Sequence, residues 1–181
     1  GVGGHCIPVD PYYLSWKARE FDFYTKFIEL AAEVNADMPE HVVRLVATGL
    51  NLHAKPLKGS RVLVLGVAFK RNIDDARNSP AQRVIELLLE AGTHVAYHDP
   101  FVPAFEVGGN ARHGPLVTLR SVALEEYLAV TDAVVVVTGH TSLNYADIAA
   151  RAPLVIDAVN VTSGIAAQPG KIIRLGAPAP S

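Results

Sequence analysis

The residues best suited to covalent chemistry lie in the first eleven positions of the sequence. Cys6 is the only cysteine, and it follows Gly3 and Gly4 and precedes Asp10 in a segment with prolines at positions 8 and 11. An accessible thiolate is a nucleophile, glycines let backbone amides approach a bound substrate, and a carboxylate can activate water. A lone cysteine is more often a small buried hydrophobe, but the glycines and Asp10 favour a nucleophile.

A second polar group follows a nearly continuous apolar run over residues 61–66. Phe69 offers a flat apolar face, and Lys70 and Arg71 can meet phosphate or sugar oxygens. Open α/β sheets bind ligands at the carboxyl ends of their strands, which is where these residues are expected. The alternative is a solvated pair of cations. No Gly-x-Gly-x-x-Gly motif is present here, which argues against the usual dinucleotide site.

The remaining candidates are histidines and strand-end aspartates. The seven histidines show no metal-ligand spacing: His41 and His53 lie too far apart on one helix, and His94 and His98 are expected to make local hydrogen bonds. His140 follows a strand and is expected to be either a local residue or one that faces a ligand. Asp99 and Asp157 could contact a ribose or cap a helix, and we favour the cap.

The elements that must position these residues alternate along the chain. Helices are predicted at 12–20, 25–54, 80–91, 121–129 and 145–151, and strands at 61–65, 93–97, 133–138, 154–157 and 171–175, with a short strand near Leu119. Pro39 interrupts the long helical stretch and predicts either two abutting helices or one kinked helix. We also predict a polar, glycine-rich segment at 107–115 and a disordered tail from residue 176.

This alternation indicates an α/β fold. We predict a doubly wound, mostly parallel sheet over residues 60–175, preceded by one long helix, with a domain boundary between 1–56 and 57–181. The 181 residues are enough to bury a core.

Composition narrows the class of protein. Half of the residues are hydrophobic, 19% are charged and the net charge is −2, so there is no basic excess that would favour a nucleic acid. No apolar run reaches the length of about 20 residues that a membrane span needs. A single cysteine cannot form an internal disulfide, and we expect a cytoplasmic location without a membrane or nucleic-acid partner.

The string Gly-x-Gly-Gly-x-Cys-x-Pro-x-Asp at residues 1–10 resembles the active-site loop of the nucleotide-sugar 6-dehydrogenases, the UDP-glucose/GDP-mannose dehydrogenase family. A second signature supports this, because Ala-Phe-Lys at 68–70 followed by Asp-x-Arg-x-Ser-Pro at 75–80 is similar to another motif of that family. The continuation of the first string into Pro-Tyr-Tyr-Leu at 11–14 looks most like the branch that acts on UDP-N-acetylhexosamines.

The resemblance implies a role for each matching residue. Cys6 and Asp10 would be catalytic; Gly3, Gly4, Phe69 and Lys70 would bind the UDP-sugar; Cys6 and Arg77 would contact NAD. The alternative for Arg77 is an ion pair with Asp74 or Asp75, and both roles can coexist.

The family's reaction oxidises a sugar C6 alcohol to a carboxylate while two NAD molecules are reduced. The resemblance implies that the Cys6 thiolate adds to an aldehyde, that the adduct is oxidised to a thioester, and that Asp10 directs the hydrolytic water. It also implies a homodimer through the 25–54 helix and a role in surface polysaccharide synthesis. Since the sequence starts inside a motif, we expect it to be a C-terminal part that is inactive alone.

Two departures from the family pattern are evident. Val159 stands where the family commonly has Arg, in the string Asp157-Ala158-Val159-Asn160, and Asn72 stands where Asp is frequent. Two alternative functions remain open. One is a UDP-glucose or GDP-mannose dehydrogenase, against which His5 and Val9 argue because that branch usually has Ser and Lys there. The other is a nucleotide-binding module whose cysteine loop has no chemical role.

Overall fold

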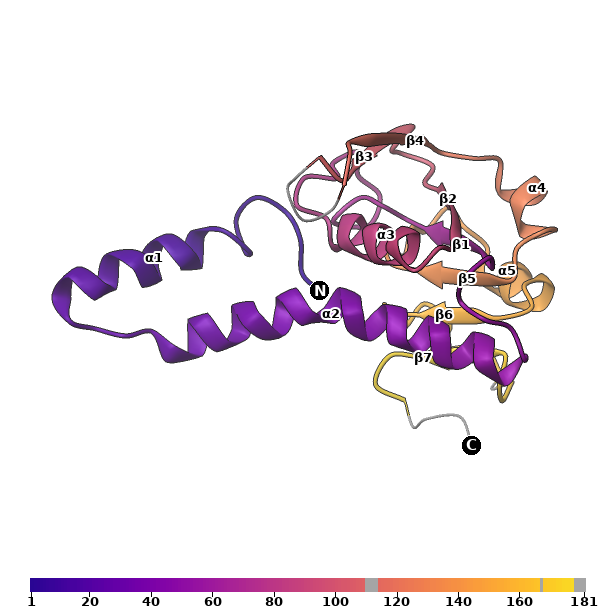
Figure 1. Cartoon of the computed structure of the whole chain (residues 1–181), viewed down its shortest axis with the longest axis horizontal. Helices are drawn as coiled ribbons and strands as arrows, with labels where there is room; N and C mark the ends of the chain where they lie inside the picture. Colours follow the sequence, from indigo (N-terminus) through magenta and orange to yellow (C-terminus); the bar gives the residue numbers. More distant parts are fainter. Residues whose placement is uncertain (110–113, 167, 178–181) are drawn as a thin grey trace.

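The computed structural model describes residues 1–109, 114–166 and 168–177 of the chain. A central sheet carries helices on both faces, and an N-terminal helical arm projects away from it (Figure 1). The arm consists of α1 (Asp10–Ala18), a 3-10 turn (Arg19–Phe21) and the first half of α2 (Lys26–Leu52).

The sheet has five strands in the order β2-β1-β5-β6-β7, and all of its pairings are parallel. The strands are β1 (Arg61–Leu65), β2 (His94–His98), β5 (Ala133–Val136), β6 (Val155–Asp157) and β7 (Ile172–Arg174). The strand order reverses between β1 and β5, because β2 lies on one side of β1 and the later strands lie on the other. The predicted doubly wound fold is therefore confirmed.

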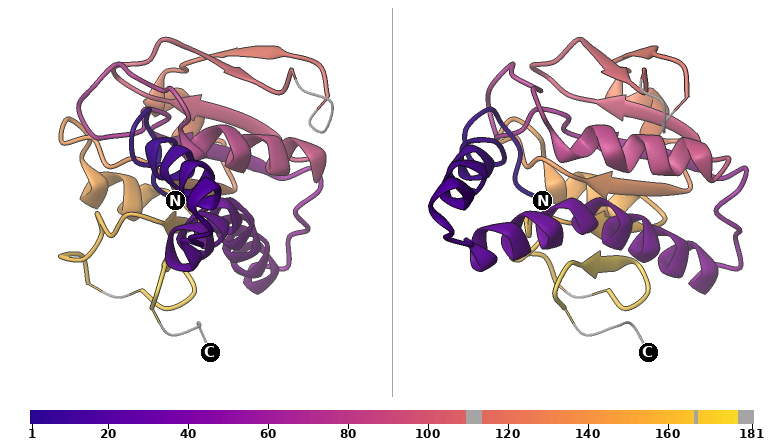
Figure 2. Two further views of the ribbon diagram at one scale, coloured as in Figure 1. Left: turned by 90° about the vertical axis from the view of Figure 1, so that its left-hand side faces the viewer. Right: turned by 60° about the vertical axis from the view of Figure 1, so that its left-hand side comes forward.

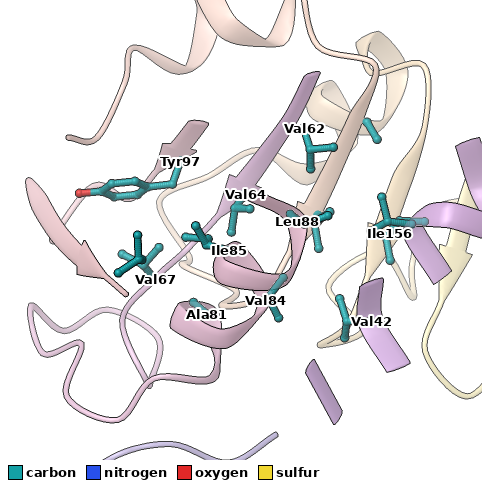
Figure 3. Packing of buried hydrophobic residues seen from close by; sticks show 14 of the residues in the cluster. Val42, Val62, Val64, Val67, Ala81, Val84, Ile85, Leu88, Tyr97 and Ile156 are labelled. Atoms are coloured by element: carbon teal, nitrogen blue, oxygen red, sulfur yellow. The ribbon is translucent and has the colours of Figure 1, made fainter. Parts of the chain in front are cut away.

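Each strand contributes side chains to two cores, as expected for a sheet covered on both faces. On one face, Val62 and Val64 pack under α2 and α3 (Pro80–Glu90), as the close view in Figure 3 shows. On the other face, Leu63 and Leu65 pack under the shorter α4 (Leu124–Leu128) and α5 (Tyr145–Arg151). The alternation of facing residues explains why β1 has no polar side chain after Arg61.

The long helix α2 is continuous through Pro39, so of the two predicted alternatives the structure has one helix and not two abutting helices. Its second half lies against the sheet, where Val42, Val46 and Leu50 are buried in the core beside α3 and β6 (Figure 2). Tertiary packing on this half stabilises a helix that the proline alone would interrupt.

An antiparallel hairpin was not predicted as such. It pairs β3 (Ala104–Val107) with β4 (Val117–Arg120), and Phe105 and Val107 extend the core beyond β2. The sequence suggested only a short strand near Leu119, because each strand is four residues long. The predicted glycine-rich segment at 107–115 and the predicted disordered tail lie partly outside the described residues.

Element boundaries differ little elsewhere. The first helix begins at Asp10 instead of residue 12, and α4 is shorter than the predicted 121–129. The start of α3 follows from its sequence: Pro80 occupies the first turn, and the Ser79 side chain accepts a hydrogen bond from the backbone N–H of Ala81.

Candidate active site

The cysteine loop is held at two places that lie before Cys6, one on the first half of α2 and one on the segment between β1 and α3. The backbone N–H and C=O of Val2 both bind the Asn35 side chain on α2, at 2.6 and 3.0 Å. The N–H of Gly4 donates to the C=O of Arg77 at 3.2 Å, and the Asn78 side chain donates to the C=O of Gly4 at 3.2 Å. The two signatures therefore meet at Gly4, which lies 74 residues from Asn78 in sequence.

Glycine is required at this junction. A Cβ at Gly3 would lie 2.7 Å from the backbone oxygen of Asn78 and from the ring of Pro80. Gly4 has a φ of +98°, and a Cβ there would lie 2.9 Å from the ring of Phe69. The paired glycines thus let the cysteine loop pack directly on Phe69.

Cys6 is exposed, and its Sγ lies 3.1 Å from the Nδ1 of His5. The His5 ring contacts the edge of Phe69, with ring centroids 6.3 Å apart. The C=O of Cys6 accepts hydrogen bonds from the N–H groups of Val9 and Asp10, a tight turn that leads directly into α1. Asp10 is exposed in the first turn of α1, so thiol and carboxylate share one short turn.

The loop after β1 carries the predicted sugar-binding residues. Phe69 is half-buried under the cysteine loop, whereas Lys70 and Arg71 are exposed. Neither cation forms an ion pair with any described residue. The N–H of Phe69 donates to the C=O of Asp75, which closes the loop on itself. Two unpaired cations next to a flat ring suit an anionic ligand with an apolar moiety.

Arg77 is held by Asp75, which confirms the predicted ion pair. The guanidinium Nε and Nη2 reach both carboxylate oxygens at 2.5 to 3.0 Å, and the Arg77 N–H also donates to this carboxylate. The hydrogen bonds from Arg77 lower the pKa of Asp75 to about 2, with a smaller contribution from the charge of His5. Asp75 in turn raises the pKa of Arg77, to which the charge of Cys6 also contributes.

Sequence reasoning missed a buried pair at the neighbouring strand ends. Asp99 follows β2 and is 3% exposed, and His140 follows β5 and is 0% exposed. The Oδ2 atom of Asp99 lies 3.0 Å from the Nε2 atom of His140. Asp99 caps no helix, so that prediction is wrong: its oxygens accept hydrogen bonds from the N–H groups of loop residues 67, 68, 101 and 102. Burial would raise the pKa of Asp99, but these hydrogen bonds together lower it.

Asp157, at the end of β6, binds the backbone of the following loop as Asp99 does. It also caps no helix, and instead accepts hydrogen bonds from the N–H groups of residues 159, 161 and 162 and from the Thr162 hydroxyl. Arg174 on β7 donates to Thr162 and Ile165, which fixes the far side of this loop. Val159 is exposed on it and supplies no charge where the family commonly has Arg.

Two other histidines bind backbone carbonyls. The Nδ1–H of His98 donates to the Val122 carbonyl, as predicted for a local residue, and the Nε2–H of His53 donates to the Gly170 carbonyl. Across residues 1–109, 114–166 and 168–177, no cluster of three His, Cys, Asp or Glu residues could hold a metal ion. Those residues also contain no helix that is long and apolar enough to cross a membrane.

Cavities lie on both sides of the cysteine loop. A small one of about 80 Å³ lies where the strand order reverses, between Phe69, Thr138 and Val159. A larger apolar groove of about 590 Å³ lies between the loop and the first half of α2; it is lined by Val2, Ile7, Pro8, Pro11, Tyr12, Phe27, Ile28, Ala31, Ala32, Asn35 and Ala36.

Two family models match the chain. Residues 63–164 match the UDP-binding domain of the UDP-glucose/GDP-mannose dehydrogenase family, and residues 1–37 match the central domain of the same family. The two matches divide the chain between the sheet and the arm with its cysteine loop.

Individual relatives agree with these matches. UDP-N-acetyl-D-mannosamine dehydrogenase of Methanococcus maripaludis is 36% identical over 140 residues, which cover 77% of this chain and 29% of the relative. UDP-N-acetyl-D-glucosamine 6-dehydrogenase of Salmonella typhi is 34% identical over 142 residues, covering 77% and 31%. The chain therefore spans about a third of the length of the curated relatives that it matches.

Solved structures show the same fold. NDP-N-acetyl-D-galactosaminuronic acid dehydrogenase from Methanosarcina mazei superposes with a TM-score of 0.74 at 32% identity, covering 97% of this chain and 38% of that one. UDP-D-ManNAc dehydrogenase from Pyrococcus horikoshii gives a TM-score of 0.69 at 29% identity, covering 87% and 34%.

Proposed function

Because the chain belongs to the UDP-glucose/GDP-mannose dehydrogenase family, we propose that it carries the thiol loop and the sugar-nucleotide domain of an NAD-dependent UDP-N-acetylhexosamine 6-dehydrogenase. The observation that carries this proposal is the packing of Gly3 and Gly4 on Phe69, which brings the exposed thiol to the loop of Lys70. The N-acetylhexosamine branch is favoured because relatives of both the mannosamine and the glucosamine type are about a third identical.

Substrate binding is assigned to the loop after β1 and to the glycines that pack on it. Lys70 would pair with the diphosphate, and the Phe69 ring would contact an apolar face of the sugar nucleotide. Backbone amides of Gly3 and Gly4 would approach the sugar, because no Cβ stands in the way. Arg71 extends the same positive surface.

Covalent catalysis is assigned to Cys6. Its thiolate would attack the C6 aldehyde, and protonation of the resulting alkoxide gives a thiohemiacetal; loss of a hydride and of the hydroxyl proton then gives a thioester. Asp10 follows the turn that Cys6 begins, and it would accept a proton from the water that hydrolyses the thioester. Covalent capture keeps the aldehyde at the site between the two oxidations.

This chain would contact only one end of the NAD molecule. Arg77 is exposed, the charge of Cys6 helps to raise its pKa, and its guanidinium would contact an anionic group of the cofactor beside the reacting carbon. When bound, NAD supplies the hydride acceptor. The described loops do not include the Gly-x-Gly-x-x-Gly turn that would hold a whole dinucleotide, so we expect no turnover from this chain alone.

Assembly as a homodimer is assigned to the first half of α2. Phe27, Leu30 and Val34 follow helical spacing and are 88%, 55% and 53% exposed. They continue into the exposed aromatics Phe21, Phe23 and Tyr24, and such a patch is typical of an interface. We further propose that the enzyme is cytoplasmic and supplies sugars for surface polysaccharide, as the resemblance of its two signatures to the family implies.

Calorimetric titration of the chain with UDP, UDP-GlcNAc and GDP tests the proposal. We expect uridine nucleotides to bind and the Lys70→Ala variant to lose about tenfold in affinity, because one charge-assisted contact is removed. Lys58→Ala is the matched control, since Lys58 is an exposed lysine before β1, at the opposite end of that strand. Equal affinity of all three proteins, or preference for GDP, would contradict the proposal.

A further inference from the structure

We propose that His140, held by Asp99, is a positioning residue that fixes the loop of Phe69 and Lys70 in the conformation that receives the sugar nucleotide. This inference rests on the proposed function of that loop. It concerns a histidine that touches none of the proposed ligand-binding side chains, and acts on them through one backbone N–H group.

The hydrogen bonds of His140 define its tautomer. The backbone N–H of Asn72 lies 3.0 Å from Nδ1, and an N–H group can only donate, so Nδ1 carries no proton. Nε2 therefore carries the proton and donates it to Oδ2 of Asp99 at 3.0 Å. The ring is fully buried and packs against Phe101, with ring centroids 5.1 Å apart, so it has no freedom to exchange these partners for water.

The Asp99 carboxylate binds the beginning of the same loop. Its Oδ2 accepts hydrogen bonds from the N–H groups of Val67 and Ala68 at 2.7 and 3.0 Å. One carboxylate oxygen thus binds the first residues of the loop directly and the end of the loop through His140. The chain of hydrogen bonds joins the carboxyl ends of β2, β1 and β5, three adjacent strands that flank the reversal of strand order.

Asn72 completes the connection. It adopts a left-handed conformation with a φ of 62°, and its side chain exchanges two hydrogen bonds with Thr141: Nδ2 donates to Oγ1 at 2.9 Å, and Oδ1 accepts from the N–H at 3.0 Å. Lys70 and Arg71 therefore lie between two fixed points, at Ala68 and Asn72, with exposed side chains. Fixing the backbone before binding removes an entropic cost that the ligand would otherwise bear.

Two amide variants separate the two hydrogen bonds of the imidazole. His140→Asn puts an acceptor near the position of Nδ1, and retains the contact with Asn72 while losing reach to Asp99. His140→Gln puts an amide near the position of Nε2, and retains the contact with Asp99 while leaving the Asn72 N–H without an acceptor. A residue with only a packing role would not distinguish them, because both remove the ring.

The experiment first measures the unliganded chain. Amide hydrogen exchange of Asn72 by NMR is expected to be slow in the wild-type chain and in His140→Asn, and at least about tenfold faster in His140→Gln. The imidazole nitrogen shifts are expected to report the tautomer protonated at Nε2. Titration with UDP-GlcNAc then follows: we expect near wild-type affinity for His140→Asn and about tenfold weaker binding for His140→Gln.

Thr141→Val is a second variant that leaves the buried pair intact. It removes one exposed hydroxyl from the Asn72 contact, and we expect weaker UDP-GlcNAc binding with a nearly unchanged melting temperature. Equal affinity losses in the Asn and Gln variants, in proportion to their loss of stability, would overturn the inference. Absence of UDP-GlcNAc binding by the wild-type chain, with Asn72 still protected, would instead contradict the proposed function.

Discussion

Single residues in this molecule take their chemical character from close neighbours. Cys6, Asp10, Phe69, Lys70 and Arg77 could be selected from the sequence because they belong to two recognisable strings. Asp99 and His140 were also candidates, but their pairing could not be predicted: they lie 41 residues apart, and only the parallel pairing of β1 with β2 and β5 brings them to one place. Sequence periodicity indicates which face of a strand or helix a residue occupies. It does not indicate which residues at the ends of neighbouring strands will lie beside it.

The contact between His5 and Cys6 predicts a dependence of thiol reactivity on the imidazole. Nδ1 lies 3.1 Å from Sγ and can accept the thiol proton, and the thiolate is the reactive form. We expect iodoacetamide to alkylate His5→Phe about tenfold more slowly than the wild-type chain at neutral pH. Mass spectrometry gives the rate without ambiguity, since the sequence has one cysteine.

His5→Phe is designed to preserve the edge contact with Phe69, so a slower rate would not come from a displaced loop. His5→Asn is the matched control that offers a hydrogen-bond acceptor without accepting a proton. Equal rates in all three proteins would show that the imidazole does not assist the thiol.

The ion pair between Arg77 and Asp75 predicts a defined pH window. The folded pKa of Asp75 is about 2, below the value of about 3.9 for an unperturbed Asp. The pair therefore contributes stability above about pH 4, and that contribution is lost as the pH falls from about 4 to about 2. We expect Arg77→Ala to raise the pKa of Asp75 measured by NMR titration. An unchanged pKa would contradict the ion pair, whereas a partial rise fits, since the backbone N–H of residue 77 remains.

At the scale of helices and strands, long periodic segments were predicted well and short ones were not. The five parallel strands and α3 agree with the sequence to within a few residues, because buried apolar runs and the Ser79-Pro80 start are strong signals. The β3–β4 hairpin was missed because its strands lack the continuous apolar run of a strand such as β5: β3 buries alternate side chains and β4 buries none. The continuity of α2 through Pro39 depends on packing against the sheet, which no local signal reports.

Gly66 shows how closely β1 and β5 approach where they end. It has a φ of +79°, and a Cβ there would lie 2.4 Å from the backbone oxygen of Thr138. Gly59 has a similar φ of +83° with no atom within 4 Å of its Cβ position. We expect Gly59→Ala to cost about 1–2 kcal/mol in unfolding free energy, and Gly66→Ala to cost about 1–3 kcal/mol more because a neighbour must move.

Urea unfolding of the two alanine variants gives the comparison directly. The difference between them isolates the close approach, because the backbone strain is common to both. Equal losses would mean that the loop after β5 can withdraw from β1 without cost.

At the scale of the whole molecule, the two halves of α2 differ in what their apolar residues contact. The second half is buried within the chain at Val42, Val46 and Leu50. The first half exposes its apolar residues instead. The boundary at 56/57 remains a proposal, since this second half shares a core with the sheet.

This division predicts where self-association can be broken. We expect the chain to sediment as a dimer at tens of micromolar, and the double variant Phe27→Ser with Leu30→Ser to sediment as a monomer without loss of helical content. Leu52→Ser is the matched control, because Leu52 is 47% exposed at the other end of the same helix. A monomeric wild-type chain, or a dimer that survives the double variant, would count against the proposed interface.

The docking of the cysteine loop has a mechanical consequence. Both of its anchors, Val2 on Asn35 and Gly4 on residues 77 and 78, lie on the amino side of Cys6, whereas α1 begins at Asp10 on the other side. The thiol therefore lies in a turn between two held segments: Gly4 is bonded to the loop after β1, and α1 is bonded to α2 through Ser15, Arg19 and Glu29 (Figure 1). The position of the sulfur is thus set partly by how α1 packs on α2, and a partner that binds the exposed aromatic face of the arm acts on the sulfur through these contacts.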